Sequence, residues 1–257
     1  MRAMLSRLFL LALTLSPAAA LAEGWAVEKS QPLPAAEGLT CAKLEVRSEG
    51  GTTARAHVVT FSAKTHSFAV MDDPDNAYNL ATAAEKRGAL AAVNGGYFHP
   101  DRTALGLRVR QGKELHPLEK SRLLSGLVIV SGDRLALVRV GEFKRTAALR
   151  EAIQTGPFLV DGSKPVAGLN ATRADARTVI ISDGAGRFGL VSTSGLTLAD
   201  TGSLLATPNL LPGLKISRAL NLDGGSSTGL WVRSEPPLYL RELRNVRDFL
   251  AIVPRGK

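Results

Sequence analysis

Residues 126–140 read GLVIVSGDRLALVRV, two apolar runs that flank the turn Ser131-Gly132-Asp133. Short apolar runs joined by a few residues that include glycine are typical of a β-hairpin. The same arrangement recurs further along, where Asp183-Gly184-Ala185-Gly186 separates the runs 178–182 and 187–193. The two hairpins predict antiparallel strand pairing in the second half of the chain.

Other short runs rich in Val, Leu and Phe predict strands along most of the chain. They lie at 56–61, 67–72, 90–93, 106–110, 218–222, 229–233 and 248–253. Helical patterns are limited to 76–87, which Gly88 ends, and to 146–154 and 197–206. Since strands outnumber helices, we expect an α+β single domain around a mixed, mostly antiparallel sheet with a few helices.

Residues 1–22 have the pattern of a signal peptide. Arg2 and Arg7 are basic, the run 8–15 is apolar, and Ala20-Leu21-Ala22 is a small-residue cleavage site. No later stretch reaches the roughly 18 apolar residues that a membrane-spanning helix needs. We therefore expect cleavage after Ala22 and a soluble mature chain that is periplasmic or secreted.

Residues 23–40 are rich in Pro and Ala without periodicity, which predicts an extended N-terminal arm. Regular structure is expected to start near Cys41, so that one domain spans 41–257. About 235 mature residues are enough for a core without disulfides or metals. Cys41 is the only cysteine, so it forms no internal disulfide. A buried, inert thiol is the favoured interpretation, and a bond between chains is the alternative.

The chain is basic, with a formal charge of +9 that falls to +7 when Arg2 and Arg7 are removed. Such a charge favours anionic partners, among them phosphate-bearing glycans and envelope polymers. Nucleic acid is not expected, because the basic residues are scattered, aromatic residues make up only 5% and no binding motif accompanies them. The sequence does not indicate an oligomeric state.

Four glycine-containing stretches interrupt the strands and carry the candidate site. In the first, Asn94 is followed by Gly95-Gly96, Tyr97, Phe98 and His99. Paired glycines let backbone amides approach a ligand closely. An ordinary strand-to-loop turn anchored by the two aromatic residues is the alternative. His99 is a candidate acid, base or phosphate donor; the four histidines lack paired ligand spacing, which argues against a histidine metal site.

The second and third stretches offer a turn and two guanidinium groups. Thr155-Gly156-Pro157 precedes an apolar strand and leaves a hydroxyl at its rim. Arg173 and Arg177 lie four residues apart at a strand entrance, where they suit forked contacts to phosphate or carboxylate. Turn formation and solvated loop charges are the alternatives.

The fourth stretch is ALNLDGGSSTGL, residues 219–230, in which Asp223 ends an apolar run and Gly224, Gly225 and Ser226 follow. Asp183 is also followed by glycine, but a hairpin turn accounts for it fully. Asp223 has more polar neighbours than a tight turn requires, which favours a functional carboxylate. The acidic run 72–76 lacks the glycine and distal glutamate of an EF-hand, so we expect a turn in which Asp75 or Asn76 caps the next helix.

In this order the four stretches resemble the phosphodiester glycosidase family, over about residues 56–253. The version NGGYFHPD followed by LGL is similar to bacterial exported members. Two departures are Val-Ile-Ile-Ser after Arg177-Thr178, where the family commonly has Ala-Ile-Gly, and Ser226 in place of a third glycine. The residues that carry the resemblance are Asn94-Gly95-Gly96-Tyr97-Phe98, Thr155-Gly156-Pro157 with Leu159-Val160, Arg177-Thr178 and Asn221-Leu222-Asp223-Gly224-Gly225-Ser226-Ser227.

The resemblance implies hydrolysis of a sugar 1-phosphodiester between the anomeric carbon and the phosphate oxygen, in a phosphate-bearing glycan or a sugar-nucleotide-like substrate. On this hypothesis Asp223 is the sugar-side carboxylate, Arg177 the phosphate clamp and His99 an assisting group. No cofactor is required, although Asp223 and backbone carbonyls suit a divalent metal. The alternative function is a non-catalytic periplasmic glycan- or anion-binding protein of the cell envelope. The expected substrate-binding residues are Asn94, Gly95, Gly96, Tyr97, Thr155, Gly156, Gly224, Gly225 and Ser226.

Overall fold

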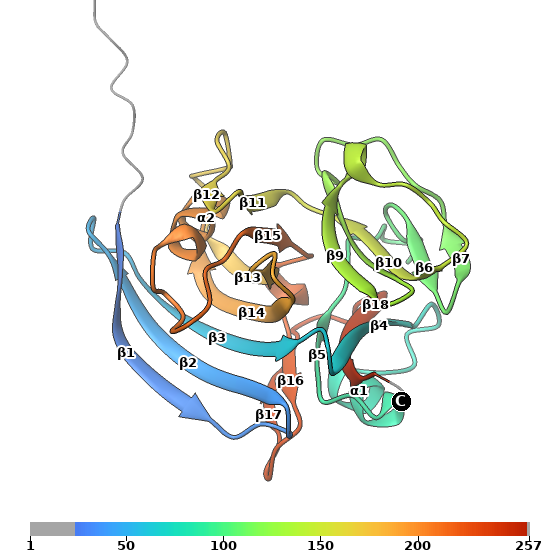
Figure 1. The fold of residues 1–257 in the computed structure, drawn as a ribbon, viewed down its shortest axis with the longest axis horizontal. Coiled ribbons are helices and arrows are strands. Elements are labelled where there is room, and N and C mark those ends of the chain that lie inside the picture. The colour runs from blue at the N-terminus through green and yellow to red at the C-terminus, as the bar shows by residue number, and fades with distance from the viewer. Residues whose placement is uncertain (1–23, 256–257) are drawn as a thin grey trace, which may run out of the picture.

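Three antiparallel sheets make up the structure (Figure 1). The computed structural model describes residues 24–255, so the predicted signal peptide lies outside the described residues. The large sheet has eight strands in the order β1-β2-β3-β14-β13-β15-β11-β12. The two five-stranded sheets have the orders β7-β6-β10-β8-β9 and β17-β16-β5-β18-β4.

The elements have the following bounds. The large sheet contains β1 (Trp25–Leu33), β2 (Leu39–Ser48), β3 (Thr53–Ser62), β11 (Phe158–Asp161), β12 (Lys164–Pro165), β13 (Asp175–Ser182), β14 (Arg187–Leu196) and β15 (Arg218–Asn221). The second sheet contains β6 (Arg108–Arg110), β7 (Lys113–His116), β8 (Gly126–Ser131), β9 (Arg134–Arg139) and β10 (Leu149–Thr155). The third contains β4 (His66–Asp72), β5 (Ala91–Asn94), β16 (Leu230–Val232), β17 (Leu238–Leu240) and β18 (Asp248–Pro254). The helices are α1 (Leu80–Arg87) and α2 (Leu198–Ala206), with short 3₁₀ turns at η1 (Val140–Glu142) and η2 (Gly225–Ser227).

One apolar core joins the three sheets. Val59 of β3, Val93 of β5, Val128 of β8 and Leu220 of β15 belong to the same buried cluster, although they come from all three sheets. Burial of such side chains is the main favourable term in folding, about 25 cal/mol per Å² of apolar surface. A shared core makes the described chain a single domain.

Both predicted hairpins are confirmed, as β8–β9 and β13–β14. The fold is richer in strands than the predicted α+β class implies, since every strand pair in the described chain is antiparallel and α1 and α2 are its only α-helices. The helix predicted at 146–154 is wrong, because most of that segment belongs to β10, which spans Leu149–Thr155. Its Leu, Ala and Glu favour a helix locally, but β10 lies between β6 and β8, where burial and pairing override propensity.

Regular structure starts earlier than the predicted position near Cys41. Residues Trp25–Leu33 form β1, which pairs with β2 and ends the large sheet on one side. Seven of its nine residues are exposed, so no apolar alternation marks the strand in the sequence. Backbone pairing with β2 alone holds β1 in place as an edge strand. The arm is therefore extended, as predicted, but it is part of the sheet.

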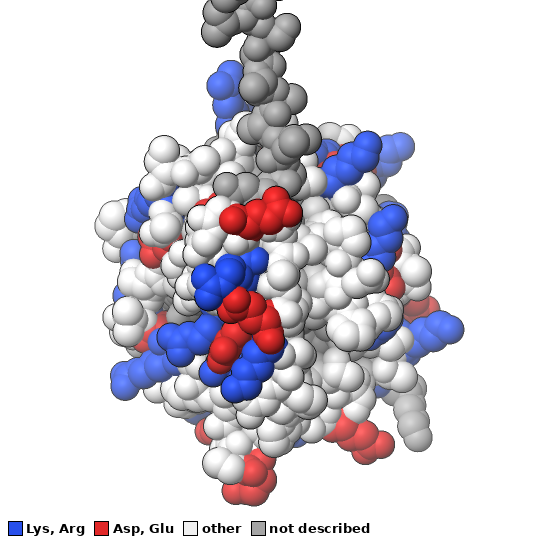
Figure 2. All heavy atoms as spheres, turned by 90° about the vertical axis from the view of Figure 1, so that its left-hand side faces the viewer, with Lys and Arg blue, Asp and Glu red and all other residues white. Residues whose placement is uncertain are grey.

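The face formed by β1 and β2 carries intermingled acidic and basic side chains (Figure 2). Arg47 pairs with Glu28 across the two strands, and Lys43 lies 3.8 Å from Glu45 on β2. The positive charge of the chain is therefore not concentrated on this face.

The helix at 197–206 is confirmed as α2, and 76–87 is confirmed in its second half as α1, which ends at Gly88 in the left-handed conformation. The predicted cap is wrong. Asn79 caps α1 by accepting from the Thr82 amide at 2.9 Å, because the preceding residues form a separate turn around the Asp73 carboxylate. In the segment 24–255 no helix combines the length and hydropathy needed to cross a membrane.

Cys41 lies buried between β1 and β3, in agreement with the favoured interpretation. Burial raises the pKa of its thiol to about 11. The reactive thiolate is therefore scarce at neutral pH, as expected of an inert core residue.

Candidate functional site

The structure brings the four glycine-containing stretches together at one end of β13 and β15, two neighbouring strands inside the large sheet. Because β13 and β15 are antiparallel, the start of one meets the end of the other, and the Leu222 amide donates to the Thr178 carbonyl at 2.8 Å. The Asp223 amide donates to the Gly95 carbonyl at 3.2 Å, which adds the end of β5. Thr155, at the end of β10, donates its hydroxyl to the Asn221 carbonyl at 2.9 Å.

Asp223 lies at the centre of this cluster with its carboxylate half-buried. The carboxylate accepts from the Gly224 amide at 2.9 Å. Burial nevertheless raises the pKa of the Asp223 carboxyl above its ordinary value. The Asp248 carboxylate acts in the same direction and the Arg244 guanidinium opposes it. A carboxyl with a raised pKa at the mouth of a strand is typical of functional sites.

Tyr97 places a phenol beside Asp223. Its hydroxyl donates to the Gly156 carbonyl at 2.8 Å and accepts from the Asn221 amide group at 2.8 Å. Burial, and secondly the Asp223 carboxylate, raise the pKa of Tyr97. The phenol is therefore neutral at physiological pH and held in a fixed orientation at the site.

Arg177 enters the site from β13 with only 9% of its surface exposed. Its Nε donates to the Leu196 carbonyl at 2.8 Å and one Nη donates to the Arg173 carbonyl at 2.6 Å. These two bonds orient the planar group and leave its other Nη beside Gly224. Burial lowers the pKa of Arg177, and the nearby Asp175 carboxylate opposes that shift. A positioned guanidinium with a free edge suits a phosphate oxygen.

Gly95 and Gly96 have a different role from the predicted one. Their amides donate to Asp248, Gly95 to the backbone carbonyl and Gly96 to the carboxylate, both at 2.8 Å. A Cβ on Gly95 would lie 1.7 Å from the Asp248 carboxylate, and one on Gly96 would lie 2.1 Å from the Arg108 guanidinium. The two glycines therefore admit a buried ion pair rather than present amides to a ligand.

That ion pair joins Arg108 to Asp248 at 2.7 Å, with 1% and 0% of their side chains exposed. Arg108 also donates to the Tyr97 carbonyl at 3.1 Å and to the Gln154 carbonyl at 3.0 Å. It thus fixes the loop that carries Tyr97. The two residues are 140 positions apart, and nothing local in the sequence indicates the pairing.

Asn94 and Thr155 are buried and use their polar atoms within the protein. Asn94 accepts from the Thr178 hydroxyl at 2.7 Å and the Gly229 amide at 3.2 Å, and donates to the Asp223 carbonyl at 2.8 Å. Thr155 is fully buried against Asn221. Both residues hold Asp223 in place and do not face outward.

The remaining predicted residues differ in position. Ser226 is exposed at the rim, Gly224 and Gly225 lie between Asp223 and Asp175, and the Gly156 carbonyl holds Tyr97. His99 is exposed on a turn, and the described contacts place it beside Asp101 rather than beside Asp223.

Two residues that were not predicted from the sequence also reach the site. Arg244 is exposed, stacks its guanidinium 4.7 Å from the centre of the Phe98 ring and donates its amide to the Ser226 carbonyl at 3.1 Å. Asp175 lies against Gly225, where a Cβ would meet both carboxylate oxygens at 3.1 Å. Its position two residues before Arg177 is the sequence feature that could have identified Asp175 as part of the site.

Two buried oxygens in the cluster, Asn221 Oδ1 and Thr228 Oγ1, have no hydrogen-bond partner among the described residues. Buried polar atoms are nearly always paired, so unpaired ones point to water or a ligand. Within residues 24–255 no group of three His, Cys, Asp or Glu side chains is arranged to hold a metal ion.

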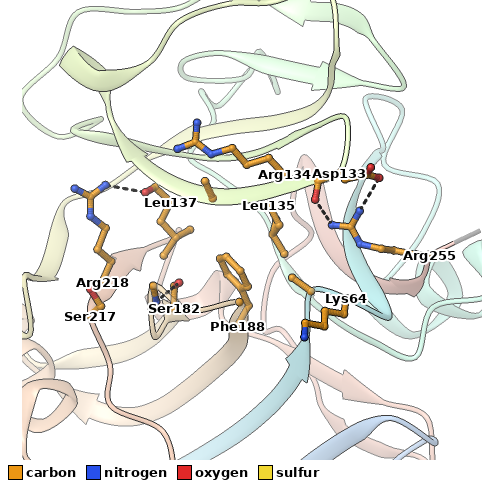
Figure 3. A pocket seen from close by; sticks show the side chains of 14 residues that line it. Lys64, Asp133, Arg134, Leu135, Leu137, Ser182, Phe188, Ser217, Arg218 and Arg255 are labelled. Atoms are coloured by element: carbon orange, nitrogen blue, oxygen red, sulfur yellow. Dashed lines mark hydrogen bonds and ion pairs between the residues drawn. The ribbon is translucent and has the colours of Figure 1, made fainter.

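A cavity of about 620 Å³ lies away from this cluster, at the opposite ends of β13 and β15 (Figure 3). The candidate site is the Asp223 cluster and not this cavity, because the carboxyl with the raised pKa, the neutral phenol and the buried guanidinium converge in the cluster.

Comparison with known proteins finds a matching family model and solved structures with a similar fold. The family model for phosphodiester glycosidase matches residues 87–253. The catalytic domain of zebrafish N-acetylglucosamine-1-phosphodiester α-N-acetylglucosaminidase, in a structure described as auto-inhibited by its pro-peptide, has a TM-score of 0.65 at 18% identity over 90% of this chain and 89% of that one. No curated protein matches the sequence significantly.

Two further solved structures share the fold. A hypothetical protein from Synechocystis has a TM-score of 0.62 at 16% identity, over 88% of this chain and 64% of that one. A putative exported protein from Burkholderia pseudomallei has a TM-score of 0.52 at 13% identity, over 82% and 74%. At these identities the likeness is one of fold.

Proposed function

Because the chain belongs to the phosphodiester glycosidase family, we propose that it is an exported hydrolase that cleaves a sugar 1-phosphodiester between the anomeric carbon and the phosphate oxygen. The products are a free sugar and a phosphomonoester. The observation that supports the proposal most directly is the Asp223 carboxyl, whose pKa is raised by burial, in one cluster with the buried Arg177 guanidinium.

The leaving group determines what such a site must supply. A phosphomonoester has a second pKa of about 6, so it leaves without the strong acid that an ordinary sugar alcohol needs. The electron pair of the breaking bond passes to the phosphate oxygen, where a fixed cation stabilises it. Arg177 is the group for this role, and the exposed Arg244 guanidinium adds charge at the rim.

The sugar carbon becomes positively charged as the bond breaks, and a carboxylate stabilises such a centre. Asp223 performs this role in its ionised form and activates the water that completes hydrolysis, taking up its proton. Tyr97 is held by Gly156 and Asn221 in a neutral form and donates no proton to the leaving group. Asn94 and Thr155 keep Asp223 in register.

A product assay tests the proposal. Purified protein is incubated with a panel of sugar 1-phosphodiesters that includes N-acetylglucosamine 1-phosphodiesters and UDP-N-acetylglucosamine, and free sugar is measured. Release of sugar is expected for at least one member. A rise in melting temperature without release of sugar would instead identify a binding protein. Export is tested separately, by cell fractionation and the mass of the mature chain, with cleavage expected after Ala22.

Arg177→Met is expected to lower kcat/KM about a hundredfold, because a cation that meets charge developing in the transition state is removed. Inhibition by the phosphomonoester product should weaken in parallel. Arg187→Met is the matched control. Arg187 begins β14, the strand next to β13, at the end of the strand pair away from Arg177, and it donates to the Gly213 carbonyl at 2.9 Å. Equal inhibition constants in the two variants would show that Arg177 does not bind phosphate.

The pH dependence follows from the raised pKa of Asp223. Activity that needs the ionised carboxylate rises with pH, and the midpoint of kcat/KM should lie above the ordinary aspartate value of about 3.9. A pH–rate profile measures this midpoint. A midpoint at or below the ordinary value would contradict the assigned role.

The stability of the protein should also depend on the protonation of the Asp223 carboxyl, but it should fall over the pH range in which activity rises. Since the folded pKa exceeds the unfolded one, the folded state binds the proton more tightly, and stability falls as pH rises through the interval between the two values. Asp223→Asn lacks this titration, so the difference in melting temperature between the variant and the wild type should grow in favour of the variant from acid to neutral pH.

A further inference from the structure

The three exposed leucines of residues 24–255 lie on two loops. Leu118 and Leu123, each 43% exposed, belong to the loop 117–125 between β7 and β8. Leu243, which is 87% exposed, belongs to the loop 241–247 between β17 and β18. Single apolar residues on a surface are ordinary, but exposed apolar residues gathered in one region mark an interaction site.

Both loops emerge at the end of the molecule that carries the Asp223 cluster. Gly126, which follows the first loop, pairs with Thr155 in the register of β8 and β10. Phe249, which follows the second loop, pairs with Asn94 at the end of β5. Thr155 and Asn94 are the residues that hold Asp223 in place. The strand registers therefore bring all three leucines to the end of the molecule where the cluster lies.

A third segment, residues 97–106, contacts both loops. The Gly106 amide donates to the Glu119 carboxylate of the first loop at 2.9 Å. The Phe98 ring lies 4.7 Å from the Arg244 guanidinium of the second loop. The segments 97–106, 117–125 and 241–247 thus form one continuous surface, which we call the leucine rim.

The second loop is fixed so that its leucine points into solvent. Glu242 is buried, and its carboxylate accepts from the Leu80 amide at 2.7 Å and from the Tyr239 hydroxyl at 2.8 Å. The next residue, Leu243, donates its amide to the Ser226 carbonyl at 2.8 Å. The backbone is therefore held on both sides of an exposed side chain.

The first loop is anchored by Gln154. Its side-chain amide donates to the carbonyls of Glu119 at 2.7 Å and Leu124 at 3.1 Å. Leu124 is 1% exposed, whereas its neighbour Leu123 is 43% exposed. Because both loops are held by bonds within the protein, binding through their leucines requires little ordering of the chain.

The exposed charged side chains of the two loops are all basic. Their glutamates are not exposed, since one binds the Gly106 amide and the other is buried. Asp101, on the third segment, is the exposed carboxylate of the leucine rim. Apolar tips beside cations complement a bilayer with anionic lipids, which is apolar inside and negative at its surface. The exposed cations, which form no ion pair within residues 24–255, are Lys120, Arg122, Arg241 and Arg244.

We propose that the leucine rim docks the protein on the surface of a bilayer that contains anionic phospholipid. The three leucines insert at the boundary between headgroups and acyl chains, and the four cations bind lipid phosphates beside them. Docking in this position turns the Asp223 cluster toward the headgroups. The inference goes beyond the proposed function and does not depend on it, because lipid binding requires no turnover.

Cosedimentation with vesicles tests the docking. Residues 23–257 are used, because they contain the whole described domain without the apolar run 8–15. They are mixed with vesicles of phosphatidylethanolamine and phosphatidylglycerol, or of phosphatidylcholine alone, at an ionic strength of about 0.15 M. We expect binding to the anionic vesicles, and binding at least about fivefold weaker to the neutral ones.

Replacing the three leucines by serine should weaken binding to the anionic vesicles at least about thirtyfold, because their burial among the lipids is lost. Leu243→Ser alone should weaken it at least about threefold. The matched control is Val27→Ser. Val27 is also an exposed aliphatic residue, but it lies on β1, which β2, β3 and β14 separate from β13. Its replacement should change vesicle binding by less than about twofold.

Replacing Lys120, Arg122 and Arg241 by glutamine should weaken binding to the anionic vesicles at least about tenfold. The control alters net charge equally by replacing three exposed lysines outside the leucine rim, and it should have less than about a twofold effect because distant charges are screened. These lysines, which form no ion pair within residues 24–255, are Lys64, Lys113 and Lys164.

Three results would overturn the assignment of the leucine rim. The first is a wild-type chain that does not bind the anionic vesicles. The second is binding that depends on the cations but not on the leucines, which would identify a surface for a soluble polyanion. The third is a leucine variant with unchanged vesicle binding but a lower kcat/KM for a soluble phosphodiester, which would assign the leucines to the substrate. If the protein hydrolyses no phosphodiester but binds vesicles through its leucines, the proposed activity fails and the docking assignment stands.

Discussion

Asp223→Asn is expected to lower kcat/KM for a sugar 1-phosphodiester about a thousandfold while the fold is retained. The substitution preserves the shape of the side chain and removes the negative charge that faces the developing positive charge on the sugar. Removing a single preorganised electrostatic group from an active site typically lowers rate by a factor of about 10² to 10³. Loss of the base that activates water adds to that effect.

Asp183→Asn is the control for this experiment. Asp183 also precedes a glycine, but its carboxylate accepts from the amides of Ala185 at 2.7 Å and Arg187 at 2.9 Å in a hairpin turn. Its replacement should leave kcat/KM unchanged. Initial rates and melting temperatures are measured for both variants. If Asp223→Asn retains activity at the wild-type level with the fold intact, the carboxylate only holds the sugar and another group performs the chemistry.

Arg108→Met is expected to destabilise the protein by about 3–5 kcal/mol, the usual effect of removing one partner of a buried ion pair. The variant leaves the Asp248 carboxylate fully buried without its cation. It also leaves the Tyr97 carbonyl without this donor, so the loop that carries Tyr97 loses an anchor. In a chain of this size each kcal/mol changes the melting temperature by roughly 2–4 °C, so the decrease should be on the order of 10 °C.

Arg145→Met serves as the comparison, because Arg145 pairs with Glu114 on the exposed surface. Exposed ion pairs contribute about 0–1 kcal/mol. Thermal and urea unfolding of both variants measure the difference. Similar melting temperatures for the two variants would mean that the Arg108–Asp248 pair does not hold the core together.

The strands that could be predicted from the sequence are those with buried apolar runs. The predicted run 67–72 lies within β4 and 126–130 within β8, since each buries most of its side chains. β1 could not be predicted in this way, because its side chains are exposed and only its backbone pairs. β10 was assigned to a helix because the features that make it a strand, its neighbours β6 and β8, are distant in the sequence.

The candidate site could likewise be predicted from the sequence only in part. Residue type and spacing singled out Asp223 and Arg177, and the structure places both in one cluster. The direction in which a side chain or an amide points could not be predicted. Asn94 and the Gly95 amide face the protein because Gly229 and Asp248 lie behind them, and both of those contacts join residues more than 100 positions apart.

The position of β18 has a consequence for the order of folding. This strand lies between β5 and β4 and supplies Asp248 to the loop at Gly95 and Gly96. The third sheet pairs residues 66–72 with 248–254, so without β18 the strands β4 and β5 are not joined and the loop at Gly95 and Gly96 lacks Asp248. Contacts of such long range form late. The third sheet and the loop at Gly95 and Gly96 are therefore completed only after residues 248–254 are available.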